Sequence, residues 1–234
     1  MRYLFLFVLM LACNGNKTSE NLGQNGDRAE GPTKIWNYLA LGDSYTVGES
    51  VPPGQSFPKQ LENALEPALN ADITTNIIAV TGWRTDNLLR ALAEETPGDD
   101  HDLVTLLIGV NNQYQNAPFE VYEREFPELL QKSLGYAGND KDRVFVISIP
   151  DWGQTPFAEG RDREAIATEL DAYNAFAKKT TEALGMVFID ITDITRQGLE
   201  QPELVAQDGL HPSAVAYERF VARMLPIIKE QLKD

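Results

Sequence analysis

The sequence predicts an α/β fold in which five parallel strands form one sheet covered by helices on both faces. Short apolar runs alternate along the chain with longer segments of helical periodicity. The apolar runs are nearly continuous, which is typical of parallel strands that are buried on both faces. A chain of 234 residues can bury one substantial core, and nothing in its composition marks a second folded domain. We therefore expect a three-layer α/β/α sandwich.

Each predicted strand is followed by a polar or glycine-containing loop and then by a helical pattern, as expected of repeated β-α units. Serines stand ahead of the first and last helical patterns, where a side-chain oxygen can accept from free backbone N–H groups. In chain order, we predict strands at residues 37–41, 74–80, 103–108, 143–149 and 187–191. The helices that follow them are predicted at residues 56–69, 85–95, 119–137, 161–184 and 213–233.

The start of the chain predicts an export signal. Arg2 precedes an apolar run that is too short to span a bilayer but suits the hydrophobic region of a secretory signal peptide. We expect residues 1–12 to be cleaved. Residues 13–34 are mostly Asn, Gly, Ser, Thr and charged residues, which predicts a flexible tether ahead of a folded domain at residues 35–234.

Cys13 is the only cysteine, so no intrachain disulfide is possible. It directly follows Met10-Leu11-Ala12, which resembles a bacterial lipobox, although Met10 replaces the usual leucine. The alternative is an ordinary signal peptide with an incidental cysteine. Lipidation of Cys13 would anchor the folded domain in the bacterial cell envelope, at the periplasm or the cell surface.

The formal net charge is −15, and removal of residues 1–12 takes away only the positive charge of Arg2 and leaves −16. Such a field repels phosphate groups. We therefore expect no nucleic-acid partner and no polyanionic substrate, and contact with a membrane only through the lipid anchor. Solubility alone is a sufficient explanation of the charge.

Two segments at opposite ends of the folded part carry residues suited to nucleophilic catalysis. Ser44 directly follows the first predicted strand, and His211 precedes the last predicted helix. A serine becomes a useful nucleophile when an imidazole takes its proton and a carboxylate holds that imidazole in the right tautomer. Asp208 can accept a hydrogen bond from the Nδ1 proton of His211 if the segment forms a tight turn. The alternative is that Ser44 and His211 cap helices and Asp208 forms a turn.

The predicted sheet brings further residues to the same place. Ser44, Gly82 and Asn111 follow the first, second and third strands, so all three lie at the carboxyl edge of the sheet, where ligands bind in such folds. His211 can reach this edge from the last helix. The second histidine, His101, precedes the third strand, and we expect it to be a solvated loop residue at the opposite edge.

The residues in these positions resemble the signature of the SGNH hydrolase superfamily, the GDSL-type esterases and lipases, over about residues 36–232. The resemblance covers Gly-Asp-Ser at Ser44, Thr-Gly-Trp at Gly82, Gly-Val-Asn-Asn at Asn111 and Asp208-x-x-His211. It implies a flavodoxin-like fold. It also implies ester hydrolysis through an acyl-enzyme on Ser44, with His211 and Asp208 completing the triad.

The resemblance further implies an oxyanion hole made of the backbone amides of Ser44 and Gly82 and the side-chain amide of Asn111. The serine does not lie in a Gly-x-Ser-x-Gly elbow, which argues against the α/β-hydrolase fold. Two positions differ from the usual family pattern, since Tyr45 replaces a leucine and Asn112 an aspartate. These differences leave the reaction class standing and leave the substrate open.

Several residues around these motifs are candidates for lining a substrate site. As a set, their aromatic rings suit either a platform for a sugar or the wall of an acyl pocket, and singly each suits packing under loops. The aromatic candidates are Tyr45, Trp83, Tyr114 and Trp152, and the remaining candidate is Asn112.

Two histidines at opposite edges and one cysteine cannot form a nitrogen or sulfur metal site, and the expected chemistry needs no cofactor. Scattered carboxylates could hold calcium only weakly. The leading hypothesis is an esterase acting on short-chain esters or on acetyl groups of carbohydrates. The alternatives are a lysophospholipase or thioesterase, an acyltransferase, and a surface binding protein without activity. The oligomeric state stays open.

Overall fold

A computed structural model describes residues 34–232 and confirms the predicted fold class. Five parallel strands form one sheet in the order β2-β1-β3-β4-β5, which is the flavodoxin-like order. The strands are β1 (Ile35–Gly42), β2 (Asp72–Ala79), β3 (Leu103–Leu107), β4 (Val144–Ile147) and β5 (Val187–Ile189). The predicted signal peptide, the lipidated Cys13 and the tether as far as residue 33 lie outside the described residues.

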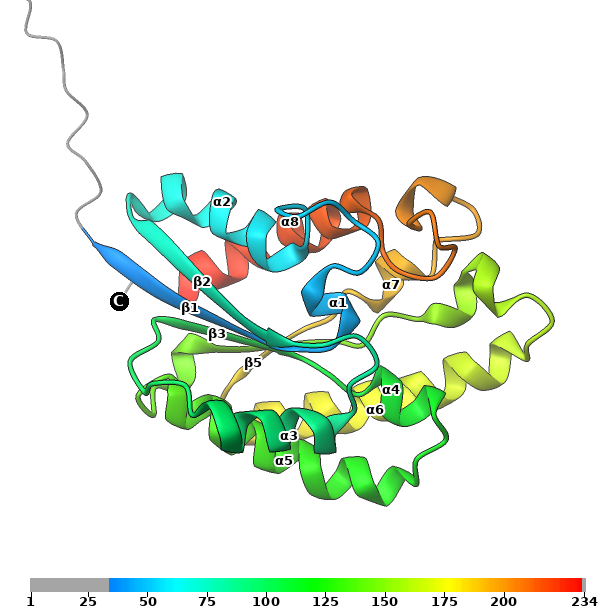
Figure 1. The fold of residues 1–234 in the computed structure, drawn as a ribbon, viewed down its shortest axis with the longest axis horizontal. Coiled ribbons are helices and arrows are strands. Elements are labelled where there is room, and N and C mark those ends of the chain that lie inside the picture. Colours follow the sequence, from blue (N-terminus) through cyan, green and yellow to red (C-terminus); the bar gives the residue numbers. More distant parts are fainter. Residues whose placement is uncertain (1–33, 233–234) are drawn as a thin grey trace, which may run out of the picture. The chain divides into compact units, whose positions relative to one another are not determined.

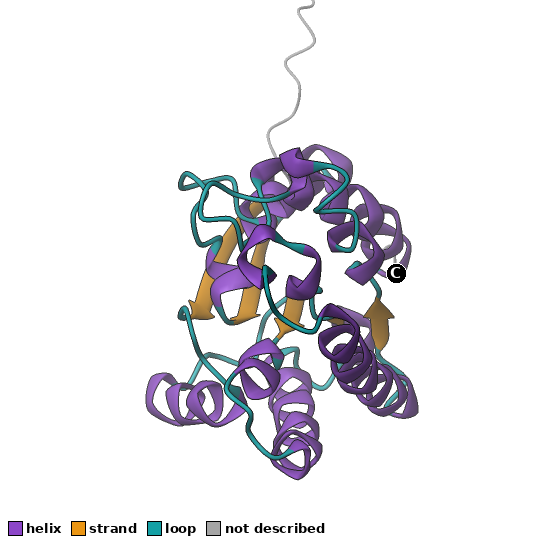
Figure 2. Cartoon of the chain, turned by 90° about the vertical axis from the view of Figure 1, so that its right-hand side faces the viewer, coloured by secondary structure: helices purple, strands orange, loops and turns teal. Residues whose placement is uncertain are grey.

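Helices cover both faces of the sheet (Figure 1). On one face α2 (Phe57–Leu69) packs against α8 (Ala214–Gln231). The other face carries α3 (Thr85–Glu95), α5 (Phe119–Tyr136) and α6 (Arg163–Ala183). Figure 2 looks at the edge where the strands end and shows them in a row between the two groups of helices.

The burial of each strand explains its sequence pattern. Every residue of β3 and β4 is buried, because both are interior strands with a helix layer on each side. These strands therefore read as continuous apolar runs. The edge strand β2 keeps exposed Thr and Asn side chains among its buried isoleucines. In α2, Phe57, Leu61 and Leu65 are fully buried at intervals of four residues, which is the spacing of one helix face.

The structure adds short helices that the sequence patterns did not predict. They are α1 (Ser44–Val47), α4 (Val110–Tyr114), α7 (Thr192–Thr195) and the 3-10 turns η1 (Lys141–Arg143), η2 (Trp152–Gln154), η3 (Pro156–Ala158) and η4 (Pro202–Leu204). Helix α6 begins at Arg163 and not at the predicted residue 161, because the Asp162 side chain caps it by accepting from Ala165 N at 3.0 Å. The fourth and fifth strands are shorter than predicted. Residues 148–149 and 190–191, which the prediction included, follow the ends of β4 and β5.

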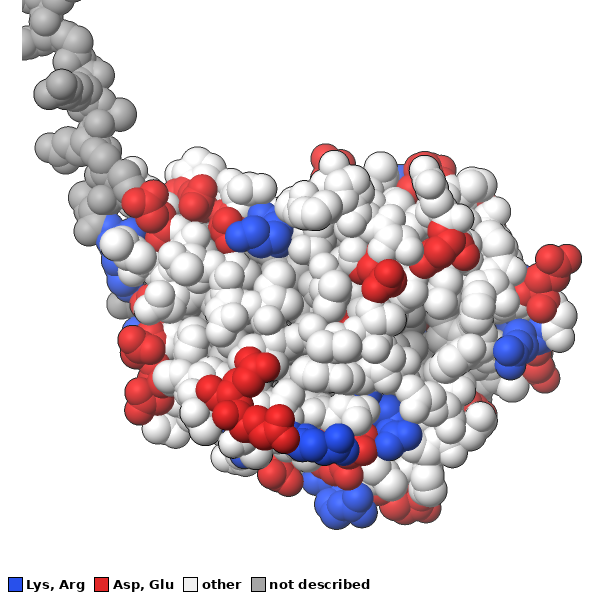
Figure 3. All heavy atoms as spheres, in the orientation of Figure 1, with Lys and Arg blue, Asp and Glu red and all other residues white. Residues whose placement is uncertain are grey.

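On the face shown in Figure 3, Lys and Arg side chains are interspersed with Asp and Glu and form no continuous basic patch. This distribution agrees with the negative net charge of the chain. Among residues 34–232, no helix has the length and apolar character needed to cross a membrane.

Candidate active site

The turn after β1 fixes the position of Ser44. Asp43 caps helix α1, its Oδ1 accepting from Tyr45 N at 3.0 Å, so Ser44 becomes the first residue of the helix. Its backbone N–H is one of the N-terminal amides that a helix leaves unpaired. Gly42 must be glycine here, since a Cβ would lie 2.1 Å from Thr46 Oγ1 and 2.4 Å from Leu107 O. Ser44 is 5% exposed, enough for its side chain to border a cavity.

The carboxyl group of Asp43 is completely buried, and burial raises its pKa to about 7 even though the hydrogen bond from Tyr45 N opposes the rise. Its second oxygen, Oδ2, has no hydrogen-bond partner among residues 34–232. Asp43 thus holds the turn by accepting from the backbone N of Tyr45.

Two side-chain amides orient the loops after β2 and β3. Gly82 has a φ of +86°, a left-handed conformation that favours glycine, and its carbonyl accepts from Gln115 Nε2 at 2.9 Å. Asn111 donates one Nδ2 proton to Trp83 O at 3.0 Å, which leaves its second Nδ2 proton free. Within the described part of the chain, the Gly82 N–H has no acceptor. Both groups therefore offer free donors to the space between these loops.

Asn112 and Trp83 do not line the space between these loops, although the sequence made them candidates for lining a substrate site. Asn112 is fully buried, its Oδ1 accepting from Thr85 N at 3.1 Å and its Nδ2 donating to Thr85 Oγ1 at 2.7 Å. The amide thus accepts and donates at once, which an ionised aspartate cannot do. It joins the start of α3 to α4. Trp83 contributes its backbone carbonyl to Asn111, as described above.

Asp208 and His211 form the expected pair within one tight turn. Asp208 Oδ2 lies 2.5 Å from His211 Nδ1, and Oδ1 accepts from the backbone N of Leu210 at 2.9 Å and of His211 at 3.0 Å. An antiparallel bridge between Val205 and Pro212 closes the base of this loop. The carboxylate fixes a proton on Nδ1, which leaves Nε2 as an acceptor.

Ser50, which the sequence analysis missed, donates to Asp208 Oδ2 at 2.7 Å. Burial raises the pKa of Asp208, but the hydrogen bonds from His211, Ser50 and the two backbone amides outweigh it and hold the pKa well below its usual range. Asp208 is therefore ionised at neutral pH. No sequence signal links Ser50 to a residue 158 positions away.

The loops enclose a cavity of about 250 Å³ that brings together the four principal candidates. Ser44, Gly82, Asn111 and His211 all line it. Its other walls are Tyr45, Thr81, Val110, Tyr114, Gln115, Trp152 and Leu210. Tyr45 is buried with its ring edge-on to His211, at 5.8 Å between centroids, while Tyr114 is 40% exposed at the rim. Three of the five predicted lining residues therefore line the cavity.

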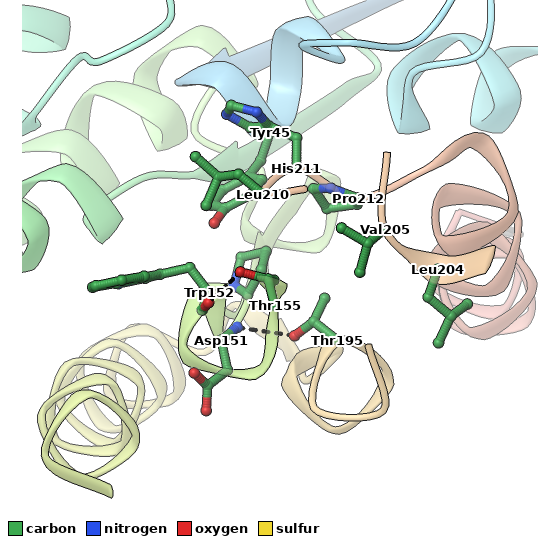
Figure 4. Close-up of a pocket in the computed structure, with 11 residues that line it drawn as sticks. Tyr45, Asp151, Trp152, Thr155, Thr195, Leu204, Val205, Leu210, His211 and Pro212 are labelled. Atoms are coloured by element: carbon green, nitrogen blue, oxygen red, sulfur yellow. Dashed lines mark hydrogen bonds between the residues drawn. The ribbon is translucent and has the colours of Figure 1, made fainter. Parts of the chain in front are cut away.

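A second cavity, of about 10 Å³, lies behind His211 (Figure 4). One wall comes from the 204–212 segment and the other from the segment of Asp151, Trp152 and Thr155. Asp151 N donates to Thr195 Oγ1 at 2.9 Å, and Thr155 Oγ1 donates to Trp152 O at 2.7 Å. This space is at most large enough for one water molecule, so it belongs to the packing that supports His211.

His101 lies before β3 as predicted, but the expectation that it is solvated is wrong. Only 8% of it is exposed, because the C-terminal end of α5 covers it. Its backbone N donates to Tyr136 O at 3.1 Å, and its Nδ1 lies 3.2 Å from the same oxygen. In the described part of the chain, no three His, Cys, Asp or Glu side chains are close enough together to hold a metal ion.

The comparisons with known proteins agree with this geometry. Residues 40–219 match the model of the GDSL-like Lipase/Acylhydrolase family. No curated protein matches the chain. Among solved structures, an acetylxylan esterase from Geobacillus stearothermophilus has a TM-score of 0.64 at 18% identity, covering 82% of this chain and 94% of that one. A lipase from a goat rumen metagenome has a TM-score of 0.58 at 23% identity, and the match covers 82% of this chain and 97% of that one. The structure of TesA has a TM-score of 0.62 at 18% identity, and the match covers 83% of this chain and 99% of that one.

Proposed function

Because the chain belongs to the GDSL-like lipase/acylhydrolase family and is an ester-hydrolysing serine hydrolase, we propose that Ser44 attacks the ester and carries the acyl group. The observation that supports this role most strongly is the 2.5 Å contact between Asp208 Oδ2 and His211 Nδ1 beside the cavity that Ser44 also lines. A serine, a histidine held by an ionised carboxylate and free amide donors then surround one space.

In this proposal His211 Nε2 removes the proton of the Ser44 hydroxyl while Oγ bonds to the ester carbonyl carbon. The tetrahedral intermediate collapses, the bond to the alcohol oxygen breaks, and the alcohol leaves with the proton from Nε2. Water then attacks the acyl-enzyme with His211 again as base, which releases the carboxylic acid and restores Ser44. Asp208 keeps the imidazole in the productive tautomer and stabilises its charged form throughout.

The oxyanion that forms in both steps takes hydrogen bonds from the Ser44 N–H, the Gly82 N–H and Asn111 Nδ2. The contacts from Gln115 and Trp83 described above support this assignment, since they hold the two loops that present these groups. Fixed donors of this kind contribute about 3 kcal/mol each to transition-state stabilisation.

Short acyl groups fit the cavity best. Its volume of about 250 Å³ is below the roughly 300–1,000 Å³ of sites that bury larger ligands. Tyr45, Trp152 and Leu210 give it apolar walls suited to a small acyl group. One structural neighbour is an acetylxylan esterase, which supports acetyl groups on carbohydrates as substrates here. We expect 4-nitrophenyl esters to be hydrolysed fastest as acetate and progressively more slowly beyond butyrate; a rate that rises with chain length would contradict this assignment.

A fluorophosphonate tests the nucleophile without a choice of substrate. The purified chain is labelled and the adduct located by peptide mass spectrometry, and we expect it on Ser44. His211→Ala should abolish labelling. His101→Asn is the matched control, because it changes the only other histidine, at the opposite edge of the sheet, and should keep the label. Folded protein that stays unlabelled, or a label elsewhere, would reject the assignment and favour a binding protein.

We propose, from the sequence alone, that the enzyme acts in the bacterial cell envelope. Export, cleavage before Cys13 and lipidation of Cys13 would hold the enzyme on a bacterial membrane at the end of the tether. Incorporation of radiolabelled palmitate into the wild type and not into Cys13→Ser would support it, whereas equal incorporation would refute it.

A further inference from the structure

Two further hollows lie in a row beside the cavity at Ser44. Tyr114 and Trp152 line both the cavity and a neighbouring hollow of about 200 Å³. A third hollow, of about 380 Å³, follows along α6 and shares three residues with the second. We call the second and third hollows together the α4–α6 groove. Its main lining residues are Gln113, Asn116, Ala165, Glu169, Ala172 and Tyr173.

A chain of hydrogen bonds holds the floor of the groove rigid. Trp152 Nε1 donates to Gln113 Oε1 at 2.9 Å, and Gln113 Nε2 donates to Glu169 Oε2 at 2.6 Å. Gln113 and Trp152 are 8% and 4% exposed, so the bond between them is shielded from water, whereas Glu169 lies at the surface. They join η2, α4 and α6. The groove therefore has a fixed shape before any ligand binds, which reduces the ordering cost of binding.

Tyr114 stands between the cavity and the groove. Its ring meets Trp152 edge-on, with 5.3 Å between centroids and 84° between planes, and it is 40% exposed. An exposed ring in this position offers a flat apolar surface at the point where the alcohol of the ester leaves the cavity. A sugar ring, which has an apolar face and a polar rim, fits such a surface.

The polar groups beyond Tyr114 select the chemistry of the occupant. The charged residues that line the second hollow are Asp162, Glu169 and Arg161, so its formal charge is negative. The chain as a whole is also negative, with a net charge of −15. Phosphate groups and uronic acids are disfavoured there. An acyl chain would desolvate carboxylate and amide groups without replacing their hydrogen bonds, which is costly. Neutral hydroxyl groups both donate and accept, and they satisfy these side chains.

We propose that the α4–α6 groove binds sugar residues on the alcohol side of the ester, so that the substrate is an acetylated neutral oligosaccharide. This proposal rests on the proposed function of the Ser44 cavity. The acetyl group occupies the cavity, the esterified sugar lies on Tyr114, and the next sugars extend along α6. Selectivity for a glycan then comes from the groove, and the reaction itself comes from the cavity.

The test compares two tryptophan substitutions on the same helix. Ala165→Trp fills the groove, while Ala175→Trp places the same ring at an exposed position of α6 that lines no described hollow. The full-length enzyme is assayed on 4-nitrophenyl acetate, on acetylated monosaccharides and on acetylated tetrasaccharides of xylose and of glucose. We expect the wild type to have at least a tenfold lower KM for a tetrasaccharide than for its monosaccharide. Ala165→Trp should remove that preference, and Ala175→Trp should keep it.

Each outcome separates the groove from the reaction. A wild type that hydrolyses 4-nitrophenyl acetate but shows no tetrasaccharide preference overturns the groove proposal and leaves the esterase assignment standing. The same holds if both tryptophan variants keep the preference, or if Ala165→Trp selectively impairs hydrolysis of 4-nitrophenyl decanoate, which would place an acyl chain in the groove. A wild type inactive on every ester overturns both proposals.

Discussion

Replacing Asp43 by asparagine should make the protein more stable at alkaline pH. The carboxyl group is completely buried, and burial raises its pKa to about 7 against the hydrogen bond from Tyr45 N. Its second oxygen has no partner within residues 34–232. Asparagine keeps the accepting oxygen at the helix cap and carries no charge to be desolvated. Asp43→Asn therefore removes a cost that the native protein bears whenever the carboxyl group ionises.

The raised pKa fixes the sign and size of this cost. Between the unfolded value of 3.8 and the native value of about 7, the native state binds more protons than the unfolded state. The free energy of unfolding therefore falls as pH rises through this range. At 1.36 kcal/mol for each tenfold change, the full difference is about 4 kcal/mol, of which about 2.5 kcal/mol develops between pH 5 and pH 8.

Urea unfolding of the wild type and Asp43→Asn at pH 5 and pH 8 measures this difference. The stability advantage of the variant should be about 2.5 kcal/mol larger at pH 8, since other titrating groups cancel in the comparison. Asp100→Asn, at an exposed loop position, is the control and should give the same difference at both pH values. An advantage of Asp43→Asn that does not change with pH would show that this carboxyl group ionises normally and would refute the reasoning.

Three further substitutions and one control substitution test the proposed roles of residues in and behind the cavity. Asn111→Ala should lower kcat by 10²- to 10³-fold with little change in KM, and an equal change in both would refute an oxyanion role. Gly82→Ala and Gly54→Ala should each lower the free energy of unfolding, measured with urea, by about 1–2 kcal/mol, because both glycines have φ near +90°. An added Cβ meets no other atom at either position, so the two costs should be alike. Only Gly82→Ala should impair esterase activity, because relief of its unfavourable φ of +86° turns the N–H away from the oxyanion, and equal activities would contradict the need for that backbone geometry. Ser50→Ala should lower kcat/KM several-fold through kcat and raise the pKa of Asp208 in carboxyl NMR titration, and an unchanged titration would refute its contact with Asp208.

The long elements of the fold could be predicted because burial on both faces of a sheet leaves a clear pattern. All five strands and the five long helices lie where the sequence placed them, with ends that differ by a few residues. The helices α1, α4 and α7 were missed, since four or five residues cannot display helical periodicity. They form where the chain leaves β1, β3 and β5, and local capping decides their position.

The candidate site was predictable as far as its residues follow strand ends or share one turn. Residues that support the site through contacts with distant parts of the chain could not be predicted. Gln115 and Gln113 are on or next to the missed helix α4, and their partners, Gly82 and Glu169, are fixed only by the packing of α4 against its neighbours. His101 shows the opposite error, since its polar sequence neighbours suggested exposure while the end of α5 covers it.

The carboxylate of Asp208 illustrates where sequence reasoning ends. Its oxygens accept four hydrogen bonds, and three of them come from its own turn, from Leu210 N and from the N and Nδ1 of His211. The spacing of three residues is sufficient to predict these. The fourth comes from Ser50, on the loop that follows α1, the short helix that begins at Ser44. Against the effect of burial, hydrogen bonds from all these donors hold the pKa of the carboxylate so low that it is too weak a base to remove a serine proton, so the proposed mechanism gives that step to His211 Nε2. Ser50 thereby couples the loop that follows Ser44 to the loop that holds the proposed base, His211, through a contact that only the folded sheet creates.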